Sequence, residues 1–307
     1  MRGVPVALLV LTLAFQPAAA QLRGSHARGQ NVAPAFEGWE ENPDGSFSLV
    51  FGYMNRNWEE EVTVPAGAEN GFSPGPADRG QPTRFLPRRN RFVFRVRVPA
   101  DFGDQDLVWT LTSAGVTEKA YGSLNRDYRI DPVVVMSETG ALGAGSSDDE
   151  VRANRPPAVA LEGERTRRVG VGEPLALVVT VTDDGLPPTR GISRPRPDAT
   201  PQQLLERALR PQVRVTVNKG VSLHFAWFVY RGEGRVSFDP PQTKTWEDTR
   251  PFANSPWAPF WTPPPIPEDG RWTVQVTFHD AGTYVLRGRA DDGGLYADEE
   301  ITVLVER

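Results

Sequence analysis

The 307-residue chain contains no cysteine and only three histidines. Without cysteine, the chain cannot form disulfide bridges, thiol nucleophiles or thiolate metal sites. Three histidines leave little material for a histidine-rich metal centre or a catalytic triad with a histidine base. The folded protein must therefore be held together by its buried apolar area, which two domains of ordinary size can supply.

Lysine is also scarce, because only 3 of the 34 basic residues are lysines. The basic residues are outnumbered by 39 acidic ones, which gives a formal net charge of −5. Proteins that bind nucleic acid or anionic membrane surfaces usually carry a strong basic excess. The charge balance therefore argues against nucleic acid as a partner.

Long apolar runs are missing except near the N-terminus. Residues 1–20 combine a basic Arg2, an apolar stretch from Val4 to Phe15 and a run of small residues that ends at Ala20. This is the pattern of a secretory signal peptide. The apolar stretch is too short for the ~20 residues of a membrane-spanning helix. We expect an exported protein, periplasmic or secreted, with no membrane span after signal cleavage.

Glycine and proline number 29 each, so turns are frequent and long helices are not expected. Apolar residues recur at every second position, which is the period of a half-buried strand. Strands are expected at residues 47–53, 91–98, 107–112 and 119–124. The alternation in 91–98 places four apolar residues on one face: Phe92, Phe94, Val96 and Val98. These strands predict an antiparallel β-sandwich domain over residues 33–131.

Residues 132–157 are expected to be a linker, because much of this segment is small and acidic without apolar periodicity. The strand pattern then returns and predicts a second β-sandwich domain over residues 158–307, so the fold class is all-β. Two long insertions interrupt this second domain. Residues 185–212 contain one short helix that begins after Thr200, and residues 240–267 contain nine prolines, which exclude a helix or a central strand.

Several motifs of the second domain resemble those of PKD-like, Ig-type extracellular modules of bacteria. The motifs are Asn154-Arg-Pro-Pro157, Val171-Gly-Glu-Pro-Leu175, Val181-Thr-Asp-Asp-Gly-Leu-Pro187, Ala281-Gly-Thr-Tyr-Val-Leu286, Ala290-Asp-Asp-Gly-Gly-Leu295 and Ile301-Thr-Val303. The resemblance covers residues 154–305 and implies an Ig-like sandwich with Trp227 as a core aromatic residue of the third strand. The Trp-Asp-Phe-Gly-Asp-Gly signature of PKD domains proper is absent from the chain.

No pattern in the sequence points to catalysis. Gly71-Phe-Ser-Pro-Gly75 has the spacing of a hydrolase nucleophile elbow, but Pro74 has no backbone N–H to donate to an oxyanion. The histidines His26, His224 and His279 do not show the spacing of a metal pair. We therefore expect no catalytic residues and a non-enzymatic protein.

Two acidic pairs are candidate metal ligands. Asp183 and Asp184 follow one strand, and Asp291 and Asp292 follow another that runs in the same direction in Ig-like topology. Both pairs should therefore lie at one end of the sandwich, where four carboxylates could bind calcium as the only cofactor. The alternative, which the sequence favours, is that Asp-Asp-Gly simply forms a stable turn.

The insertion 240–267 carries four aromatic candidates for ligand binding: Trp246, Trp257, Phe260 and Trp261. Aromatic rings on proline-stiffened loops can stack on sugars or anchor a protein partner. The alternative is that they cover apolar surface, because the strand 223–230 is apolar on both faces and leaves Phe228 and Tyr230 pointing outward. We expect the covering role, because solvent-exposed rings would lose much of the apolar burial that stabilises a domain.

Together these patterns predict an exported, non-enzymatic interaction or structural protein of the cell envelope or extracellular space. Its partner would be an unidentified protein or a glycan. The alternative function is a carbohydrate- or calcium-dependent ligand-binding protein that uses the loop 240–267 or the four aspartates.

Cleavage after Ala20 would give a mature protein that begins at Gln21. Mass spectrometry of the exported protein tests this expectation, because the mass should equal that of residues 21–307. Exported material that still carries residues 1–20 would contradict it.

Overall fold

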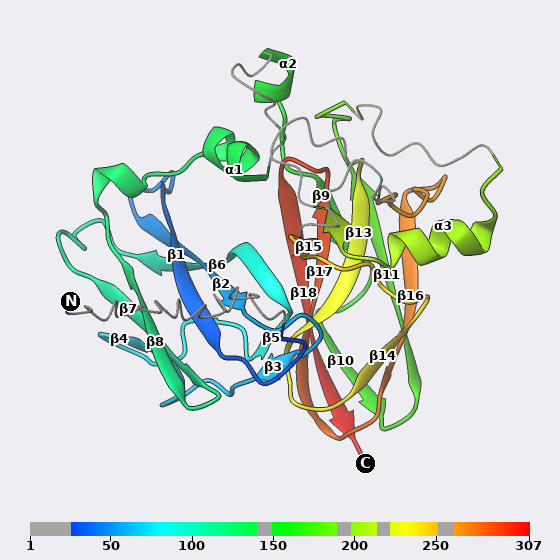
Figure 1. Ribbon diagram of the computed structural model, residues 1–307, viewed down its shortest axis with the longest axis horizontal. Coiled ribbons are helices and arrows are strands. Elements are labelled where there is room, and N and C mark those ends of the chain that lie inside the picture. Colours follow the sequence, from blue (N-terminus) through cyan, green and yellow to red (C-terminus); the bar gives the residue numbers. More distant parts are fainter. Residues whose placement is uncertain (1–25, 140, 142–148, 189–197, 214–221, 251–260) are drawn as a thin grey trace, which may run out of the picture.

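The computed structural model describes residues 26–139, 141, 149–188, 198–213, 222–250 and 261–307. The described residues form mostly β-strands, arranged as two sandwiches that lie side by side (Figure 1). The all-β fold class is therefore the one that the alternating sequence predicts. Within these residues, no helix is both long enough and apolar enough to cross a bilayer.

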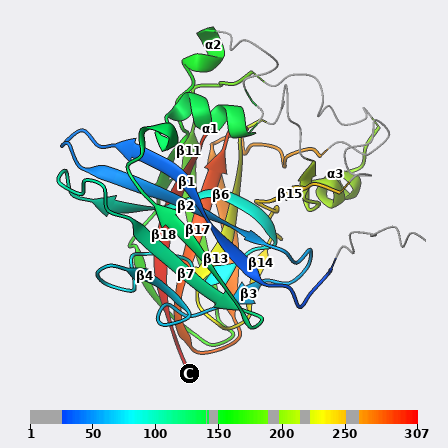
Figure 2. The ribbon, with the colours of Figure 1, turned by 60° about the vertical axis from the view of Figure 1, so that its left-hand side comes forward.

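The N-terminal sandwich packs two three-stranded antiparallel sheets against each other (Figure 2). The first sheet has the order β1 (Val32–Glu41), β2 (Phe47–Asn55), β6 (Arg88–Val98). The second has the order β4 (Asn70–Ser73), β7 (Leu107–Ser113), β8 (Val116–Gly122), and the short strands β3 (Val62–Thr63) and β5 (Arg84–Phe85) form a separate pair.

The core of this sandwich is aromatic. The ring centroids of Phe51, Phe72, Phe94 and Trp109 all lie 5.0–6.0 Å from one another. Trp109 Nε1 donates to Asn70 Oδ1 at 2.9 Å, so its indole is buried without an unpaired donor. Aromatic pairs of this kind each contribute about 0.5–1.5 kcal/mol beyond their buried area.

The C-terminal sandwich has the strand arrangement of an Ig-type fold. One sheet has the order β14 (Val236–Asp239), β16 (Arg271–Phe278), β11 (Pro174–Thr182), β9 (Ala158–Leu161). The other has the order β10 (Thr166–Gly170), β18 (Tyr296–Glu306), β17 (Gly282–Asp291), β13 (His224–Arg231), with β10 parallel to β18.

Two aromatic residues occupy positions typical of Ig-type domains in this second sandwich. Trp227 of β13 is buried in the core, as the resemblance implies. Tyr284, near the start of β17, donates from its hydroxyl to the carbonyl of Asp280 at 2.8 Å, which is the tyrosine corner of Ig-type domains. Gly234 permits this contact, because a Cβ atom at that position would collide with the Tyr284 hydroxyl.

The short helix expected after Thr200 is α3 (Pro201–Ala208). Thr200 Oγ1 accepts from the backbone N–H of Gln203, and Gln203 Oε1 accepts from the backbone N–H of Thr200. This capping box satisfies two donors that a helix N-terminus would otherwise leave unpaired. The helix lies on the outer side of the C-terminal sandwich (Figure 1).

Residues 132–157, which we expected to be a linker, form packed structure where they are described. Helix α1 (Pro132–Thr139) begins after Asp131, whose Oδ1 accepts from the Val134 N–H at 2.9 Å, and helix α2 (Asp149–Arg152) follows. A buried apolar cluster, here called the junction cluster, joins these helices to both sandwiches: Val50, Phe92, Ile130, Val135, Met136, Ala141, Val151 and Leu295. The segment therefore binds the two sandwiches to each other.

Strand β6 departs from simple alternation. Residues 91–93 of β6 lie opposite the single residue Gly52 of β2, and Phe92 has a φ of +52°. This bulge turns Phe92 into the junction cluster, while Val93 takes the place in the sandwich core. The expectation that Phe92 shares one face with Phe94, Val96 and Val98 is therefore wrong.

Candidate functional site

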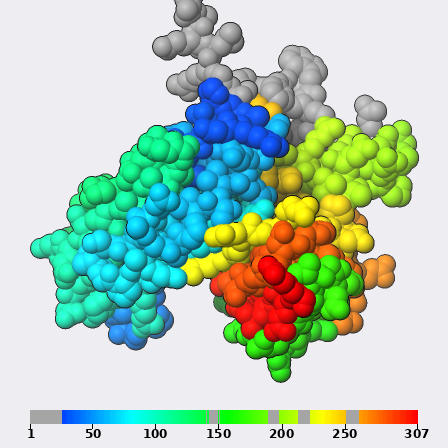
Figure 3. Space-filling model, turned by 90° about the horizontal axis from the view of Figure 1, so that it is seen from below, coloured from blue at the N-terminus to red at the C-terminus, as the bar shows by residue number. Residues whose placement is uncertain are grey.

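The two sandwiches meet on the outer face of β13. Tyr230 is only 2 % exposed because it packs into the apolar core of the N-terminal sandwich. Its hydroxyl donates to the carbonyl of Gly80 at 2.6 Å, and its carbonyl accepts from the Thr83 N–H at 3.2 Å. The N-terminal sandwich therefore covers Tyr230, and the expectation that the insertion 240–267 does so is wrong. Figure 3 shows the yellow segment that contains β13 and β14 against the cyan N-terminal sandwich.

Side chains from the C-terminal sandwich also complete the hydrogen bonds of β6. Because β6 lies at the edge of its sheet, its outward carbonyls need donors from elsewhere. Tyr296 Oη donates to the carbonyl of Phe92, and Arg287 Nη1 donates to the carbonyl of Val93. Both carbonyls belong to the bulge of β6, so the irregular part of this strand is the part that contacts the second sandwich.

Arg287 is the centre of the charged contacts at this junction, and it is only 6 % exposed. Its guanidinium lies 3.5 Å over the ring of Tyr230, and its Nε donates to Glu300 Oε1 at 2.8 Å. Asp298 Oδ2 lies 3.6 Å from Nη1 of the same guanidinium. The aromatic ring and the two carboxylates compensate for the loss of hydration of a buried cation.

Arg289, two residues further along β17, has a similar set of contacts. Its guanidinium forms two hydrogen bonds with Asp298, at 2.7 and 2.8 Å, and lies 3.9 Å over the Tyr296 ring. Burial alone would raise the pKa of Asp298, but the charge and hydrogen bonds of Arg289 hold that pKa below its ordinary value. The carboxylate therefore stays ionised inside the junction.

One ion pair and two cation–π contacts continue the contact around this buried centre. Arg231 forms two hydrogen bonds with Asp78, at 2.7 and 3.0 Å. The insertion also reaches the N-terminal sandwich, because Arg250 and Arg88 both lie over the Trp58 ring, at 4.6 and 3.9 Å. The two sandwiches are thus joined by apolar, aromatic and ionic contacts along one continuous surface.

The four aspartates considered as calcium ligands bond to the backbone of their own turns. In the described part of the chain, no three acidic or histidine side chains gather in a group that could hold a metal ion. Each carboxylate instead accepts backbone N–H groups of its own turn, at 2.6–2.9 Å: Asp183 from Gly185, Asp184 from Leu186, Asp291 from Gly293, and Asp292 from Gly294 and Leu295. These hydrogen bonds are those of the turns that the sequence favours for both Asp-Asp-Gly sequences.

Asp292 differs from the other three aspartates because it is buried, at 2 % exposure. Burial raises the pKa of its carboxyl to about 7, although the hydrogen bonds from Leu295, Gly294 and Asn154 oppose this shift. Asn154 Nδ2 donates to Asp292 Oδ2 at 3.3 Å, and Asn154 Oδ1 is buried without a hydrogen-bond partner. The site therefore favours a protonated carboxyl.

The aromatic candidates of the insertion are buried where the structure describes them. Trp246 and Trp261 are each 7 % exposed, so neither provides an open stacking platform. Trp261 packs edge-on against the His224 ring at 5.0 Å and donates from Nε1 to the carbonyl of Ala208 at 3.0 Å. Both indoles are buried, as expected, but Trp261 packs on His224 and not on Phe228 or Tyr230. Trp257 and Phe260 lie outside the described residues.

A cavity of about 340 Å³ lies where the insertion, β13, β14 and the N-terminal sandwich meet. We call it the junction cavity. Trp246 and residues 241–245 line one part, and Phe228 lines another. From the N-terminal sandwich come Leu86 and Arg84, whose Nε lies 2.6 Å from Glu61 Oε2. The aromatic density of the insertion pointed to Trp246, but no sequence signal pointed to Leu86 or Arg84, because only the docking of the sandwiches brings them there.

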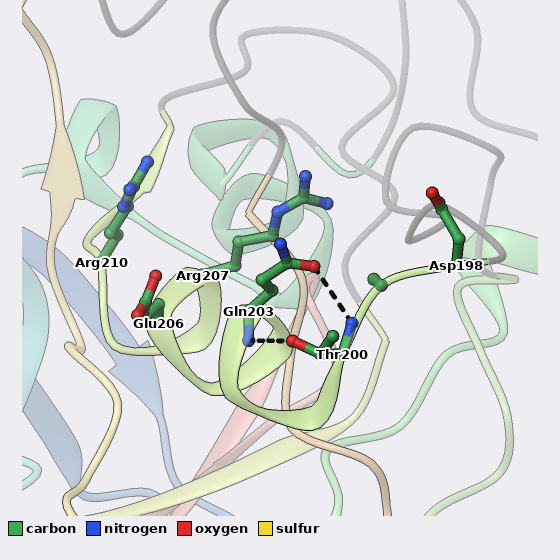
Figure 4. A pocket seen from close by; sticks show the side chains of 7 residues that line it. Asp198, Thr200, Gln203, Glu206, Arg207 and Arg210 are labelled. Atoms are coloured by element: carbon green, nitrogen blue, oxygen red, sulfur yellow. Dashed lines mark hydrogen bonds between the residues drawn. The ribbon is translucent and has the colours of Figure 1, made fainter.

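A second hollow of about 310 Å³ lies on α3 (Figure 4). Figure 4 shows that Thr200 and Gln203, which line it, direct their polar atoms to each other in the capping box. None of its lining residues is among the buried polar groups of the described chain that lack a partner. The junction cavity is therefore the better candidate for a binding site.

Comparison with known proteins does not assign the chain to a family. No protein-family model and no curated protein matches the sequence. Domains 4 and 5 of the S-layer protein SbsC align with a TM-score of 0.25 and 10 % identity, covering 91 % of this chain and 98 % of that one.

Two further solved structures show the same low level of similarity. The Yersinia pseudotuberculosis adhesin InvE aligns with a TM-score of 0.22 and 11 % identity over 91 % of this chain and 60 % of its own. A three-Ig structure of titin aligns with a TM-score of 0.21 and 8 % identity over 90 % and 64 %. Similarity at this level carries no argument about function, and the finer resemblance to PKD modules stays a prediction.

The raised pKa of Asp292 should make stability depend on pH. The native carboxyl keeps its proton up to about pH 7, whereas an unfolded one loses it near 3.8. The folded state therefore binds more protons between these values, and the free energy of unfolding should fall as the pH rises through this window. Asp292→Asn removes the titration, and the Asn154 amide can turn so that its unpaired Oδ1 accepts from the new amide.

We expect the Asp292→Asn variant to match the wild type near pH ~4 and to exceed its unfolding free energy by about 2–4 kcal/mol near pH ~8. Urea unfolding across this range measures the difference, with Asp104→Asn, at an exposed position, as the control. A difference between Asp292→Asn and wild type that does not change with pH would contradict the assignment.

Proposed function

We propose that the protein is an exported, non-enzymatic structural or interaction protein of the cell envelope or extracellular space, in which the two sandwiches act as one rigid unit. The observation that carries this proposal is the buried Arg287, which contacts Val93 of one sandwich and Tyr230 and Glu300 of the other. Domains on one chain usually move relative to each other unless their interface is large and apolar. The contacts around Arg287 oppose such motion.

Apolar burial supports the rigid unit. Separating the sandwiches would expose the Tyr230 ring and open the junction cluster, in which Phe92 and Leu295 come from opposite sandwiches. Full burial of one large apolar side chain contributes about 1.5–3 kcal/mol. Several such side chains lie at the junction, so the docked arrangement is strongly favoured over a separated one.

The histidines of the described residues support a non-enzymatic protein. His224 is buried between Gln212, at 3.1 Å from its Nε2, and the Trp261 ring. His279 Nε2 lies 3.0 Å from Ser237 Oγ on the exposed surface. A nucleophile and base also need a third group that orients the base, and among the described residues no side chain bonds to His279 Nδ1. This serine and histidine are better understood as a surface hydrogen bond.

The proposed location rests on residues 1–20, which lie outside the described residues. A rigid pair of sandwiches suits a protein that holds a partner, a protein or a glycan, at a fixed position. Packing between the sandwiches holds their relative orientation, because α1 and the described residues of the junction cluster contact both of them.

Replacement of Arg287 tests the proposal. Arg287→Met leaves the carbonyl of Val93 and the carboxylate of Glu300 without their donor. Glu300 is 45 % exposed, so water can replace part of its lost contact, and the main loss comes from the unpaired Val93 carbonyl, about 1–3 kcal/mol. We expect the wild type to unfold in urea in a single cooperative transition, and the variant to lose stability by this amount or to unfold in two steps.

The matched control is Arg168→Met. Arg168 pairs with Glu306 on the surface, where the two side chains are 68 % and 64 % exposed. Exposed pairs contribute about 0–1 kcal/mol, so this variant should unfold like the wild type. Two separate transitions in the wild type, or equal effects of both substitutions, would contradict the rigid unit.

A further inference from the structure

The residues that line the junction cavity carry an unusual number of buried polar atoms without partners. Ten buried side-chain polar atoms in the described part of the chain have no hydrogen-bond partner. Four of the ten belong to residues that line this one cavity: Trp227 Nε1, Thr243 Oγ1, Thr245 Oγ1 and Trp246 Nε1. Leaving one buried polar group unpaired costs about 1–3 kcal/mol, so native proteins rarely keep several together without a use for them.

We propose that the junction cavity is a binding site for a neutral saccharide of one or two rings, whose oxygen atoms pair with these four groups. The volume of about 340 Å³ lies at the lower end of the ~300–1,000 Å³ typical of small-molecule sites, which suits a ligand of this size. The inference rests on the proposed docked unit, because Arg84 and Leu86 reach the cavity only when the sandwiches are docked.

The hydrogen-bonding character of the four groups favours sugar hydroxyls. An indole N–H only donates, whereas a threonine hydroxyl both donates and accepts. Sugar hydroxyls also do both, so they can accept from Trp227 and Trp246 and exchange hydrogen bonds with the two threonines. The apolar C–H faces of a sugar ring match the rest of the lining, which includes Leu86, Phe228, Phe238 and Pro241.

The charges of the cavity favour a neutral ligand. Arg84 and Glu61 neutralise each other at 2.6 Å, and Arg84 also donates to the carbonyl of Gly234 at 2.8 Å. Lys244 directs its ammonium over the Trp246 ring, 5.2 Å from the centroid. A peptide is a poorer match, because its N–H groups need acceptors, and only the two threonine oxygens among the four groups can accept.

Binding requires a rearrangement of the lining. The four polar atoms are buried, and three of them lie in residues 243–246, in the connection between β14 and β15 (Glu247–Asp248). The side chains of Thr243, Thr245 and Trp246 must therefore turn toward the ligand. This places Trp246 in a new environment, so its fluorescence should report binding.

The test is a titration of the full-length mature protein by calorimetry and tryptophan fluorescence. The probes are glucose, N-acetylglucosamine, maltose, cellobiose and N,N′-diacetylchitobiose at millimolar concentration, with a proline-rich peptide as the comparison. Trp246→Phe keeps an aromatic ring without the N–H, and Thr243→Val keeps the shape without the hydroxyl. Trp272→Phe is the matched control, because Trp272 Nε1 is also buried and unpaired but does not line this cavity.

We expect at least one saccharide to bind, and Trp246→Phe and Thr243→Val each to weaken it by about tenfold. The Trp272→Phe control should keep the wild-type affinity. Both cavity variants should fold, because each removes an unpaired buried polar group, and a single unfolding transition in urea verifies this. That transition also separates a failure of this inference from a failure of the rigid unit.

Three results would overturn the inference. In the first, none of the five saccharides binds. In the second, only the peptide binds, which would assign the cavity to a protein partner. In the third, Trp272→Phe weakens binding as much as Trp246→Phe does, which would place the site elsewhere.

Discussion

The way in which the two sandwiches dock depends on the hydrogen-bond and charge partners of one buried guanidinium. Arg287 needs compensation for its lost hydration, and it finds a carbonyl at Val93 in one sandwich and a carboxylate at Glu300 and a ring at Tyr230 in the other. Because the Val93 carbonyl belongs to the other sandwich, the guanidinium gains this partner only when the two sandwiches are docked. The same docking buries Tyr230, supplies donors to the edge of β6 and forms one wall of the junction cavity.

The bulge at Phe92 makes this docking possible. A regular β6 would keep Phe92 in the N-terminal core, and the junction cluster would lose its aromatic residue. With φ at +52°, Phe92 turns outward, and its carbonyl and that of Val93 meet Tyr296 and Arg287. A local irregularity of one strand thus links the fold of one sandwich to the position of the other.

The sequence was sufficient for features that depend on local chemistry. Alternation located β2, β6, β7 and β8, Thr200 and Gln203 signalled the capping box, and the Asp-Asp-Gly sequences form turns, as the sequence favours. It was insufficient for the junction, because Arg287 and Val93 are 194 positions apart and alternation looks the same with or without a bulge. The lining of the cavity could be predicted only in part. The density of aromatic residues indicated Trp246, but Leu86 comes from the other sandwich and reaches the cavity only through docking.

The central claim is that the two sandwiches form one rigid body in solution. Residual dipolar couplings of backbone N–H groups test it most directly, because each sandwich reports its own alignment tensor. If the account is correct, couplings from β1 to β8 and couplings from β9 to β18 will fit one common tensor with the docked geometry. Two tensors of clearly different magnitude would show independent motion of the sandwiches and would contradict the account.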